Sequence, residues 1–376
     1  MRFEPTDTQA AFRREMRSFA DETIAPIAGE ADRTGEFPDE ILTELGEMGV
    51  TGLTLSKEHG GSGGTLVDLV IAIEELSAVM MPIASALSLH LGVATVIERF
   101  GSLQLKREFL PEMARYETVG ALGLSEDNAG SDKSRLETTA ERDGDEWVLS
   151  GHKRWVTNFF GADYVLTYAK AGSEREAPHN VTAFLVPTDA FEVDHVWETL
   201  GARALKSPRV TLSNVRVSDD RRVGAVGDGL VDRGSIYNGV NVPARAVGIA
   251  RAALEDTVAH TADREQFGRS LDGFQGIGWR VAEMARRVDA ARLLTLRAAD
   301  RADRGHDPAR ELAMAKIDAT ETAVAVTNEA LQLHGGIGYT AAADIERYLR
   351  DARLLTIAGG PNELHRNTLA DTVYGR

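Results

Sequence analysis

The spacing of apolar residues changes twice along the 376-residue chain, and these changes divide it into three parts. Up to about residue 117 the apolar residues recur with a helical period. From 118 to 225 the pattern becomes short runs rich in β-branched and aromatic residues, which are typical of strands. After Gly229 a helical period returns. We therefore expect an α+β protein with three domains: an N-terminal α-helical domain over 1–117, a middle antiparallel β domain over 118–225 and a C-terminal four-helix bundle over 226–376.

Local signals support this division. Thr6 with Gln9, and Thr65 with Asp68, have the spacing of capping boxes at helix starts, and Pro38 is placed where a first helical turn tolerates it. The expected strands are TrpValLeuSer at 147–150, TyrValLeuThrTyr at 164–168, ValThrAlaPheLeuVal at 181–186 and ArgValThrLeuSerAsnValArgVal at 209–217. The apolar residues expected on the inner faces of two long C-terminal helices are Ile277, Val281, Met284 and Val288, and then Leu312, Ala315, Ala319, Ala323, Val326, Ala330 and Leu333.

The composition excludes several classes of partner and chemistry. A formal net charge of −16 without a basic stripe argues against nucleic acid as a partner. The absence of cysteine excludes disulfides and thiolate chemistry. No uninterrupted apolar run approaches the ~18 residues of a membrane span, so we expect no membrane association and a cytoplasmic protein. Only seven of the 42 basic residues are lysine, which fits either a salt-rich cytosol or a high-GC coding background.

Familiar catalytic motifs are missing. The nine histidines lack metal-binding spacing, so no metal site is expected. Ser125 is not in the turn motif of a hydrolase nucleophile. The GlyGlySerGlyGly run at 60–64 lacks the GlyLys ending of a phosphate loop, and no GxGxxG follows a strand.

Two helical segments are instead interrupted by glycines. Residues 264–275 read ArgGluGlnPheGlyArgSerLeuAspGlyPheGln, and 332–340 read GlnLeuHisGlyGlyIleGlyTyrThr. Arginine, amides, aromatic rings and exposed backbone suit a phosphate and a flat heterocycle, so a bound nucleotide cofactor is expected. Hydroxyls and amides at 122–132, and the indole in TrpValThrAsn at 155–158, would suit a flavin.

The order of these segments resembles the acyl-CoA dehydrogenase family over nearly the whole chain. The matching segments are GluGluLeu at 74–76, HisLeuGly at 90–92, LeuSerGluAspAsnAlaGlySerAsp at 124–132, TrpValThrAsn at 155–158, ValThrAlaPheLeuValPro at 181–187, ArgGluGlnPheGly at 264–268, PheGln at 274–275, LeuHisGlyGlyIleGlyTyr at 333–339 and ArgTyrLeuArgAspAlaArg at 347–353.

The resemblance implies an FAD-dependent enzyme that desaturates an acyl-CoA or another acyl thioester and passes electrons to an acceptor such as an electron-transfer flavoprotein. It also implies a homotetramer or dimer with FAD shared between subunits. The flavin half of the site would comprise Leu122, Leu124, Ser125, Gly130, Ser131, Trp155 and Thr157. The adenosine half would comprise Arg264, Gln266, Phe267, Leu271, Phe274, Gln275, Gln332, Leu333, Gly335 and Gly336, with Pro361 and Glu363 also near the cofactor. The substrate would meet Ser131, Tyr237, Asn238, Ala358 and Gly359.

The chain departs from the family where the chemistry needs a base. Removal of the α-proton requires a carboxylate, yet the two positions that carry it among relatives hold Gly359 and Asn238 here. Gly239 replaces the arginine expected next on that helix, and Pro361 replaces a threonine. The backbone amide of Gly359 would still be able to hydrogen-bond the thioester carbonyl.

Three explanations for the missing base remain open. Another group would replace it, with Glu363, Tyr237, Glu74 and Glu75 as candidates, although Glu363 also fits a helix cap and the Glu74 pair fits a structural helix. Alternatively, the chain is the silent subunit of a hetero-oligomer. The third alternative is another flavin reaction, such as an oxidase or monooxygenase reaction. The acyl substrate and its carrier stay open as well.

Overall fold

The computed structural model describes residues 5–172, 179–230 and 235–376, and for 235–238 it describes the backbone alone. Seven named helices form the N-terminal part: α1 (Asp7–Phe19), η1 (Ala20–Ile24), α2 (Ala25–Thr34), α3 (Asp39–Glu47), α4 (Leu66–Val79), α5 (Met81–Phe100) and α6 (Leu103–Ala114), with a short turn of helix at η2 (Lys57–His59). Both capping boxes are confirmed at the starts of α1 and α4. Pro38 lies one position earlier than expected, as the N-cap of α3.

Helix α5 is long and apolar enough to cross a membrane by length and composition, with a mean hydropathy of 1.4 in its most apolar window. However, 83% of that window is buried inside the chain, as is usual for a helix in a protein core. His90 of α5 joins the helix to the sheet: its ring contacts the Met113 carbonyl oxygen through Nε2, at 2.8 Å, and accepts the Gly120 N–H. Burial lowers the pKa of His90 to about 4.

The middle part is one sheet of eight strands: β1 (Gly120–Gly123), β2 (Thr139–Asp143), β3 (Glu146–Lys153), β4 (Tyr164–Ala171), β5 (Val181–Pro187), β6 (Glu192–His195), β7 (Arg209–Ser218) and β8 (Arg222–Val223). Its order is β6-β7-β3-β2-β4-β5-β8, with β1 paired to β4. The four expected strands are confirmed within β3, β4, β5 and β7.

The expectation of a purely antiparallel sheet is wrong in one respect, because β4 pairs in parallel with both β1 and β2. Parallel neighbours need a long crossover between them. Residues 124–163 provide one, since the β2–β3 hairpin lies within this stretch and returns the chain to the same end of the sheet.

The C-terminal part consists of long helices: α7 (Ser235–Asp263), α8 (Gln275–Asp303), α9 (Ala309–His334), α10 (Ile345–Leu355) and α11 (Asn362–Tyr374). A small hairpin, β9 (Glu265–Gln266) with β10 (Arg269–Ser270), joins α7 to α8. The expected inner positions are buried at Met284 and Val288 and along α9 from Ala315 to Ala330, but Ile277 and Val281 are half-buried. The start of α8 therefore has an apolar face that this chain covers incompletely.

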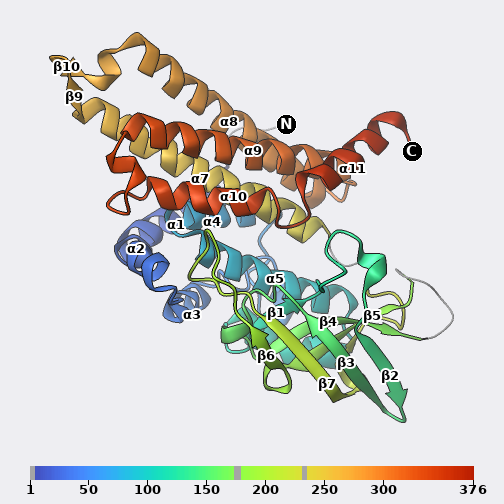
Figure 1. Ribbon diagram of the computed structural model, residues 1–376. Coiled ribbons are helices and arrows are strands. Elements are labelled where there is room, and N and C mark those ends of the chain that lie inside the picture. The colour runs from blue at the N-terminus through green and yellow to red at the C-terminus, as the bar shows by residue number, and fades with distance from the viewer. Residues whose placement is uncertain (1–4, 173–178, 231–234) are drawn as a thin grey trace.

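The helices of the two ends share a single core, since Leu69 and Ile73 of α4 cluster with Val240 and Ala244 of α7. Helices α5 and α6 also cover one face of the sheet, where Ile97 and Phe109 pack in a cluster with Leu166 of β4. The N-terminal helices thus form a layer between the sheet and the C-terminal bundle, as Figure 1 shows.

Candidate functional site

The loop between α10 and α11 has the backbone shape of a glycine turn. Gly359 has φ of +68° and Gly360 has φ of +91°, in the left-handed region that favours glycine. A Cβ atom on Gly359 would lie 2.9 Å from Cγ2 of Val242 on α7. The loop therefore lies directly against α7, and its conformation fits a glycine rather than the expected carboxylate residue.

Lys316 of α9 anchors this loop through three hydrogen bonds. Its Nζ donates to the carbonyl oxygens of Thr356, at 3.2 Å, and Gly360, at 2.8 Å, and to Oδ1 of Asn362, at 2.7 Å. Burial lowers the pKa of Lys316 to about 8. Three acceptors spread over seven residues fix the path of the loop around Gly359. Sequence reasoning missed Lys316, which stands in an ordinary helical pattern.

His365 is a second residue that sequence reasoning missed. It lies in the first half of α11, and its Nε2 is 3.1 Å from the carbonyl oxygen of Gly359. Partial burial lowers the pKa of the imidazole, which favours the neutral form of the ring. The available signal was a titratable side chain six residues after the expected base position.

The other expected substrate and base positions are near the same place or outside the described part. Tyr237 and Asn238 lie on α7, and their side chains are outside the described residues. Asn238 is four residues before Val242, so its backbone lies one turn away on the same side of α7 as the Gly359 contact. Ala358 is half-buried beside Gly359. Pro361 is the N-cap of α11, and Glu363 is exposed in its first turn.

Glu74 and Glu75 are excluded as replacement bases. Both are fully buried on α4, and Arg13 and Arg251 contact both of them. Burial alone would raise the pKa of Glu74, but the cations around it, Arg292 foremost, hold that pKa below its usual range. These carboxylates form an ion-pair network that joins α1, α4, α7 and α8, which confirms their structural interpretation.

The expected flavin half begins in the loop after β1, which a buried ion pair anchors to the sheet. Lys153 Nζ of β3 lies 2.5 Å from Glu126 Oε1, and both side chains are fully buried. Glu126 also accepts the backbone N–H groups of Glu137 and Thr138. This anchor fixes Ser125, whose carbonyl oxygen accepts the Arg154 N–H at 2.8 Å.

That hydrogen bond places the Ser125 loop next to the segment containing Trp155 and Thr157. Trp155 has φ of +59°, a conformation strained for a bulky residue, and its side chain is 45% exposed. Its ring is 4.3 Å from that of Trp197. The Thr157 hydroxyl shares a hydrogen bond with Ser207. Of the remaining expected residues, Leu124 is buried, Leu122 is half-buried, and Gly130 and Ser131 are exposed.

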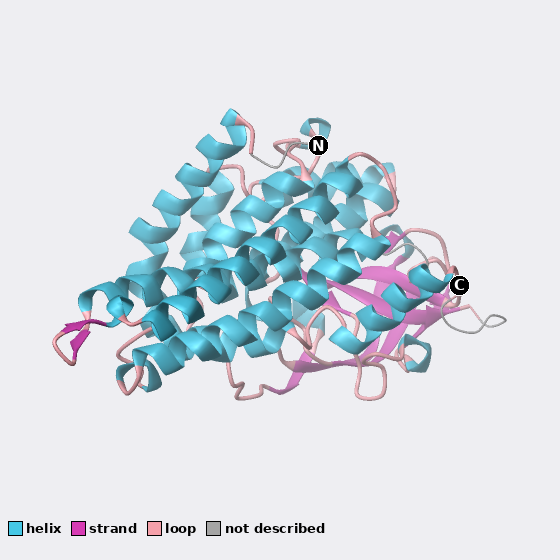
Figure 2. Ribbon diagram, turned by 90° about the horizontal axis from the view of Figure 1, so that it is seen from above, coloured by secondary structure: helices cyan, strands magenta, loops and turns pink. Residues whose placement is uncertain are grey.

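The structure thus brings an exposed indole, two hydroxyls and backbone amides together, and these groups fit a planar heterocycle with polar edges. It does not bring the adenosine half to the same place. Arg264, Gln266 and Phe267 lie at the β9–β10 hairpin, at the end of the bundle remote from the sheet in both Figures 1 and 2.

Most residues of this second half are open to solvent. Phe267 is 94% exposed with φ of +53°, and apart from the adjoining residues no described atom lies within 4 Å of a Cβ placed on Gly335 or Gly336. Arg264, Gln266, Gln275 and Gln332 are exposed as well, and Leu271, Phe274 and Leu333 are half-buried. Charged, amide and aromatic groups with uncovered glycine backbone fit a pyrophosphate and adenosine, but one chain cannot join the two halves.

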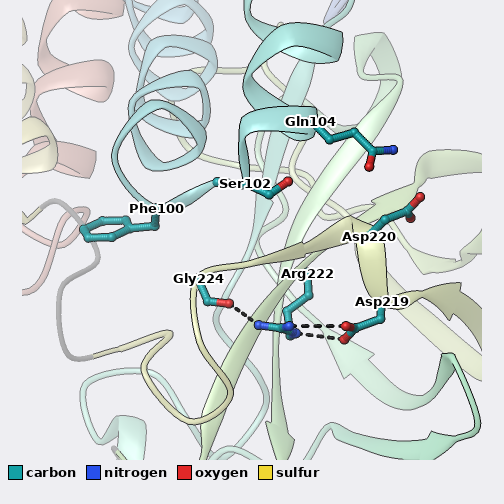
Figure 3. Close-up of a pocket in the computed structure, with 8 residues that line it drawn as sticks. Phe100, Ser102, Gln104, Asp219, Asp220, Arg222 and Gly224 are labelled. Atoms are coloured by element: carbon teal, nitrogen blue, oxygen red, sulfur yellow. Dashed lines mark hydrogen bonds and ion pairs between the residues drawn. The ribbon is translucent and has the colours of Figure 1, made fainter.

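A separate polar cavity opens between the α5–α6 turn and β8. Figure 3 shows Arg222 at its edge, donating to Asp219 and to the Gly224 carbonyl oxygen. The hydrogen bond from Arg222 holds the pKa of Asp219 at about 2. Because Arg222 is paired with Asp219, and none of the expected site residues lines this cavity, it is not the candidate site.

Comparisons with known proteins agree along the whole chain. Residues 6–117, 121–215 and 238–374 match the family profiles of the acyl-CoA dehydrogenase N-terminal, middle and C-terminal domains. The chain is 34% identical over 379 residues to the short-chain-specific acyl-CoA dehydrogenase of Clostridium acetobutylicum, with 100% of both chains covered.

Solved structures give the same result. The chain matches butyryl-CoA dehydrogenase from Megasphaera elsdenii with a TM-score of 0.96 at 31% identity, covering 100% of both chains. A chain in the structure of the electron transferring flavoprotein of Acidaminococcus fermentans matches with a TM-score of 0.96 at 31% identity, covering 99% of each. The protein therefore belongs to the acyl-CoA dehydrogenase family and is a flavoprotein enzyme of that type.

Proposed function

We propose that this chain desaturates an acyl thioester between its α and β carbons, with an acyl-CoA as substrate and FAD as cofactor. The observation that carries the proposal is the Gly359 loop, which Lys316 holds against α7 in a chain that matches the family over all three domains. The proposed electron acceptor is an electron-transfer flavoprotein, in line with the match to a chain from such a structure.

The chain's own groups have defined tasks in this proposal. The Ser125, Trp155 and Thr157 surface would hold the flavin, which supplies the acceptor for the hydride that leaves the β-carbon. The backbone N–H of Gly359 would donate a hydrogen bond to the thioester carbonyl and stabilise the charge that develops as the α-proton leaves. Ser131 would contact the carrier portion of the thioester.

We assign the removal of the α-proton to His365, since neither of the two expected base positions holds a carboxylate. Its Nε2 contacts the Gly359 carbonyl oxygen, so the ring lies beside the expected base position. If Nε2 carries the hydrogen of the neutral ring, Nδ1 is left as a proton acceptor. Partial burial lowers the pKa of His365, which favours the neutral ring that such a role requires.

The second candidate is a silent FAD-binding subunit whose partner chain supplies the carboxylate. The backbone at Gly359 favours it, because a left-handed φ and a close contact with Val242 disfavour a glutamate at this position. In both cases the functional unit is an oligomer, a homotetramer or dimer in the first and a hetero-oligomer in the second. The hairpin of one subunit would complete the flavin site of another.

The experiment is anaerobic mixing of the purified holoprotein with saturated acyl-CoA thioesters of two to sixteen carbons, followed by the visible flavin band. Bleaching of that band, with formation of the 2-enoyl thioester, is the expected result. Tight thioester binding without bleaching at any chain length would instead support the silent subunit. If no thioester binds, both candidates fail.

A further inference from the structure

Arg245 of α7 is a buried cation without an acidic partner. The residue is 6% exposed. Its guanidinium donates to Oδ1 of Asn241, at 2.9 Å, to the Asn241 carbonyl oxygen and to the Ser85 hydroxyl on α5. All three acceptors are neutral, and no carboxylate of a described side chain forms an ion pair with it. Burial lowers the pKa of Arg245 to about 10, which still leaves the group charged at neutral pH.

Three other buried cations of this protein have acidic partners. Arg251, six residues further along α7, is also 6% exposed, and it contacts Glu74, Glu75 and Glu255. Arg347 pairs with Asp344, and Lys153 pairs with Glu126. A buried charge is costly unless an opposite charge lies beside it. Arg245 therefore lacks, within the described structure, the anion that its burial requires.

The position of Arg245 connects it with the substrate site. It follows Val242 by three residues, so the two side chains leave neighbouring points on one side of α7, about 4.5 Å apart along the helix axis. Val242 is the residue that a Cβ on Gly359 would touch. The uncompensated guanidinium thus originates one helical turn from the place where the thioester would meet the Gly359 loop.

Lys316 adds a second positive charge beside the same loop. Its three hydrogen-bond acceptors are neutral, and Glu363 and Glu321 act on it only through space. The expected base positions carry no negative charge, because they hold Gly359 and Asn238. Two buried cations, Arg245 and Lys316, therefore lie near the expected place of the acyl group, which would favour a negatively charged substrate over a neutral one.

We propose that Arg245 binds a carboxylate at the far end of a short acyl chain, so that the substrate is the thioester of a dicarboxylic acid. The inference rests on the proposed thioester function and specifies its substrate class. Ser85 and Asn241 orient the guanidinium. Its remaining N–H groups would donate to the carboxylate, since arginine binds carboxylates through paired hydrogen bonds. Because Arg245 lies one helical turn from the loop, a short acyl chain would span the distance between them.

The test measures binding to the FAD-loaded protein by calorimetry, with glutaryl-CoA and pentanoyl-CoA as probes. Both have five acyl carbons, and they differ by the terminal carboxylate. We expect wild-type protein to bind glutaryl-CoA at least about tenfold more tightly. Arg245→Met should abolish this preference, and Arg245→Lys should keep part of it. Arg107→Met, the same change at an exposed site on α6, should leave it intact.

The outcomes separate this inference from the proposed function. Equal binding of both probes to wild type overturns the Arg245 assignment and leaves the thioester function standing. Binding of neither probe overturns both. Free glutarate serves as a third probe: if it binds with the affinity of glutaryl-CoA and Arg245→Met abolishes this binding, Arg245 is a site for small free anions and not for the acyl chain. Thermal unfolding of each variant shows that the fold is retained.

Discussion

Gly359 occupies the position where the family resemblance implies a catalytic carboxylate, and its backbone conformation disfavours a side chain there. We predict that Gly359→Glu lowers the free energy of unfolding by about 1–3 kcal/mol, because a left-handed conformation disfavours side chains and the new Cβ meets Val242. Chemical denaturation measures this change, and flavin bleaching with acyl-CoA should show no gain.

The companion variant Gly359→Glu with Val242→Ala provides the control for the steric part. It should recover part of the lost stability, since it removes the Cγ2 atom of Val242 that would lie 2.9 Å from the new Cβ. A Gly359→Glu protein as stable as wild type and more active would show that the loop accepts a carboxylate without strain.

His365 allows a second prediction at the residue scale. Glutamine in place of this histidine can still donate to the Gly359 carbonyl oxygen but cannot accept the α-proton, so His365→Gln should lower the desaturation rate by about 10²-fold or more. Because the pKa of His365 is lowered, the neutral base persists to a lower pH than usual, and the wild-type rate should fall only below the ordinary histidine pKa of about 6.5. A rate profile across the acidic and neutral range measures both effects.

His306→Gln, at an exposed site between α8 and α9, is the matched control and should leave the rate and its pH profile unchanged. If His365→Gln retains the wild-type rate and profile, the histidine positions the loop and does not take the proton.

The sequence alone predicts a functional role for some of the site residues and not for others. Arg264, Gly335 and Trp155 stand in segments whose composition is unusual by itself, so the sequence alone marks them. Lys316 and Arg245 are not marked in this way, because their surroundings come from distant parts of the chain. The Lys316 partner Asn362 is 46 residues away, and the Arg245 partner Ser85 is 160 residues away.

At the scale of elements, some strands could be predicted from the sequence and others could not. The runs at 181–186 and 209–217 were predicted because their β-branched residues are numerous. Strand β1 reads GlyAlaLeuGly, β6 is exposed at all four positions, and β8 has two residues, so none carries an alternating apolar pattern. Neighbouring strands define these elements, which local propensity cannot show.

A buried ion pair between Lys153 and Glu126 anchors the Ser125 loop to the sheet. We predict that Lys153→Met lowers the free energy of unfolding by about 3–5 kcal/mol, because it leaves Glu126 buried without its cation. The same variant should retain less FAD, since Ser125 and Leu124 adjoin Glu126 on the loop. Denaturant unfolding and the flavin absorbance of the purified protein measure the two effects.

The double variant Lys153→Met with Glu126→Gln is the control, because it removes both charges and keeps most of the volume. It should be more stable than Lys153→Met alone. If the single variant matches wild type in stability and flavin content, the pair does not anchor the loop.

At the scale of the whole molecule, the hairpin that carries part of the adenosine half lies at the end of the bundle remote from the sheet that anchors the flavin half (Figures 1 and 2). The hairpin end also carries large apolar groups that this chain leaves exposed: Phe267 at 94%, Tyr339 at 81% and Trp279 at 66%. Large exposed apolar groups beside polar ones are typical of protein interfaces. Covering this end with a second subunit would explain both observations at once.

The last prediction tests this arrangement. Phe267→Asp adds a charge to the hairpin tip, where the one aromatic neighbour of the ring is Phe274, 6.4 Å away between ring centroids, among the residues that the structure describes. If the ring is an anchor of the interface, its loss should weaken association by about 2 kcal/mol or more, roughly thirtyfold. Analytical ultracentrifugation should then show smaller species, and the protein should lose FAD on dilution.

Leu103→Asp is the matched control, because Leu103 is 72% exposed at the start of α6, where an acidic residue suits the helix N-terminus. It should keep the wild-type assembly and flavin content. A Phe267→Asp protein that remains assembled and yellow would separate the hairpin from the cofactor. In that case the exposed glycines at the end of α9 would need another explanation, because nothing in the described part of one chain covers them.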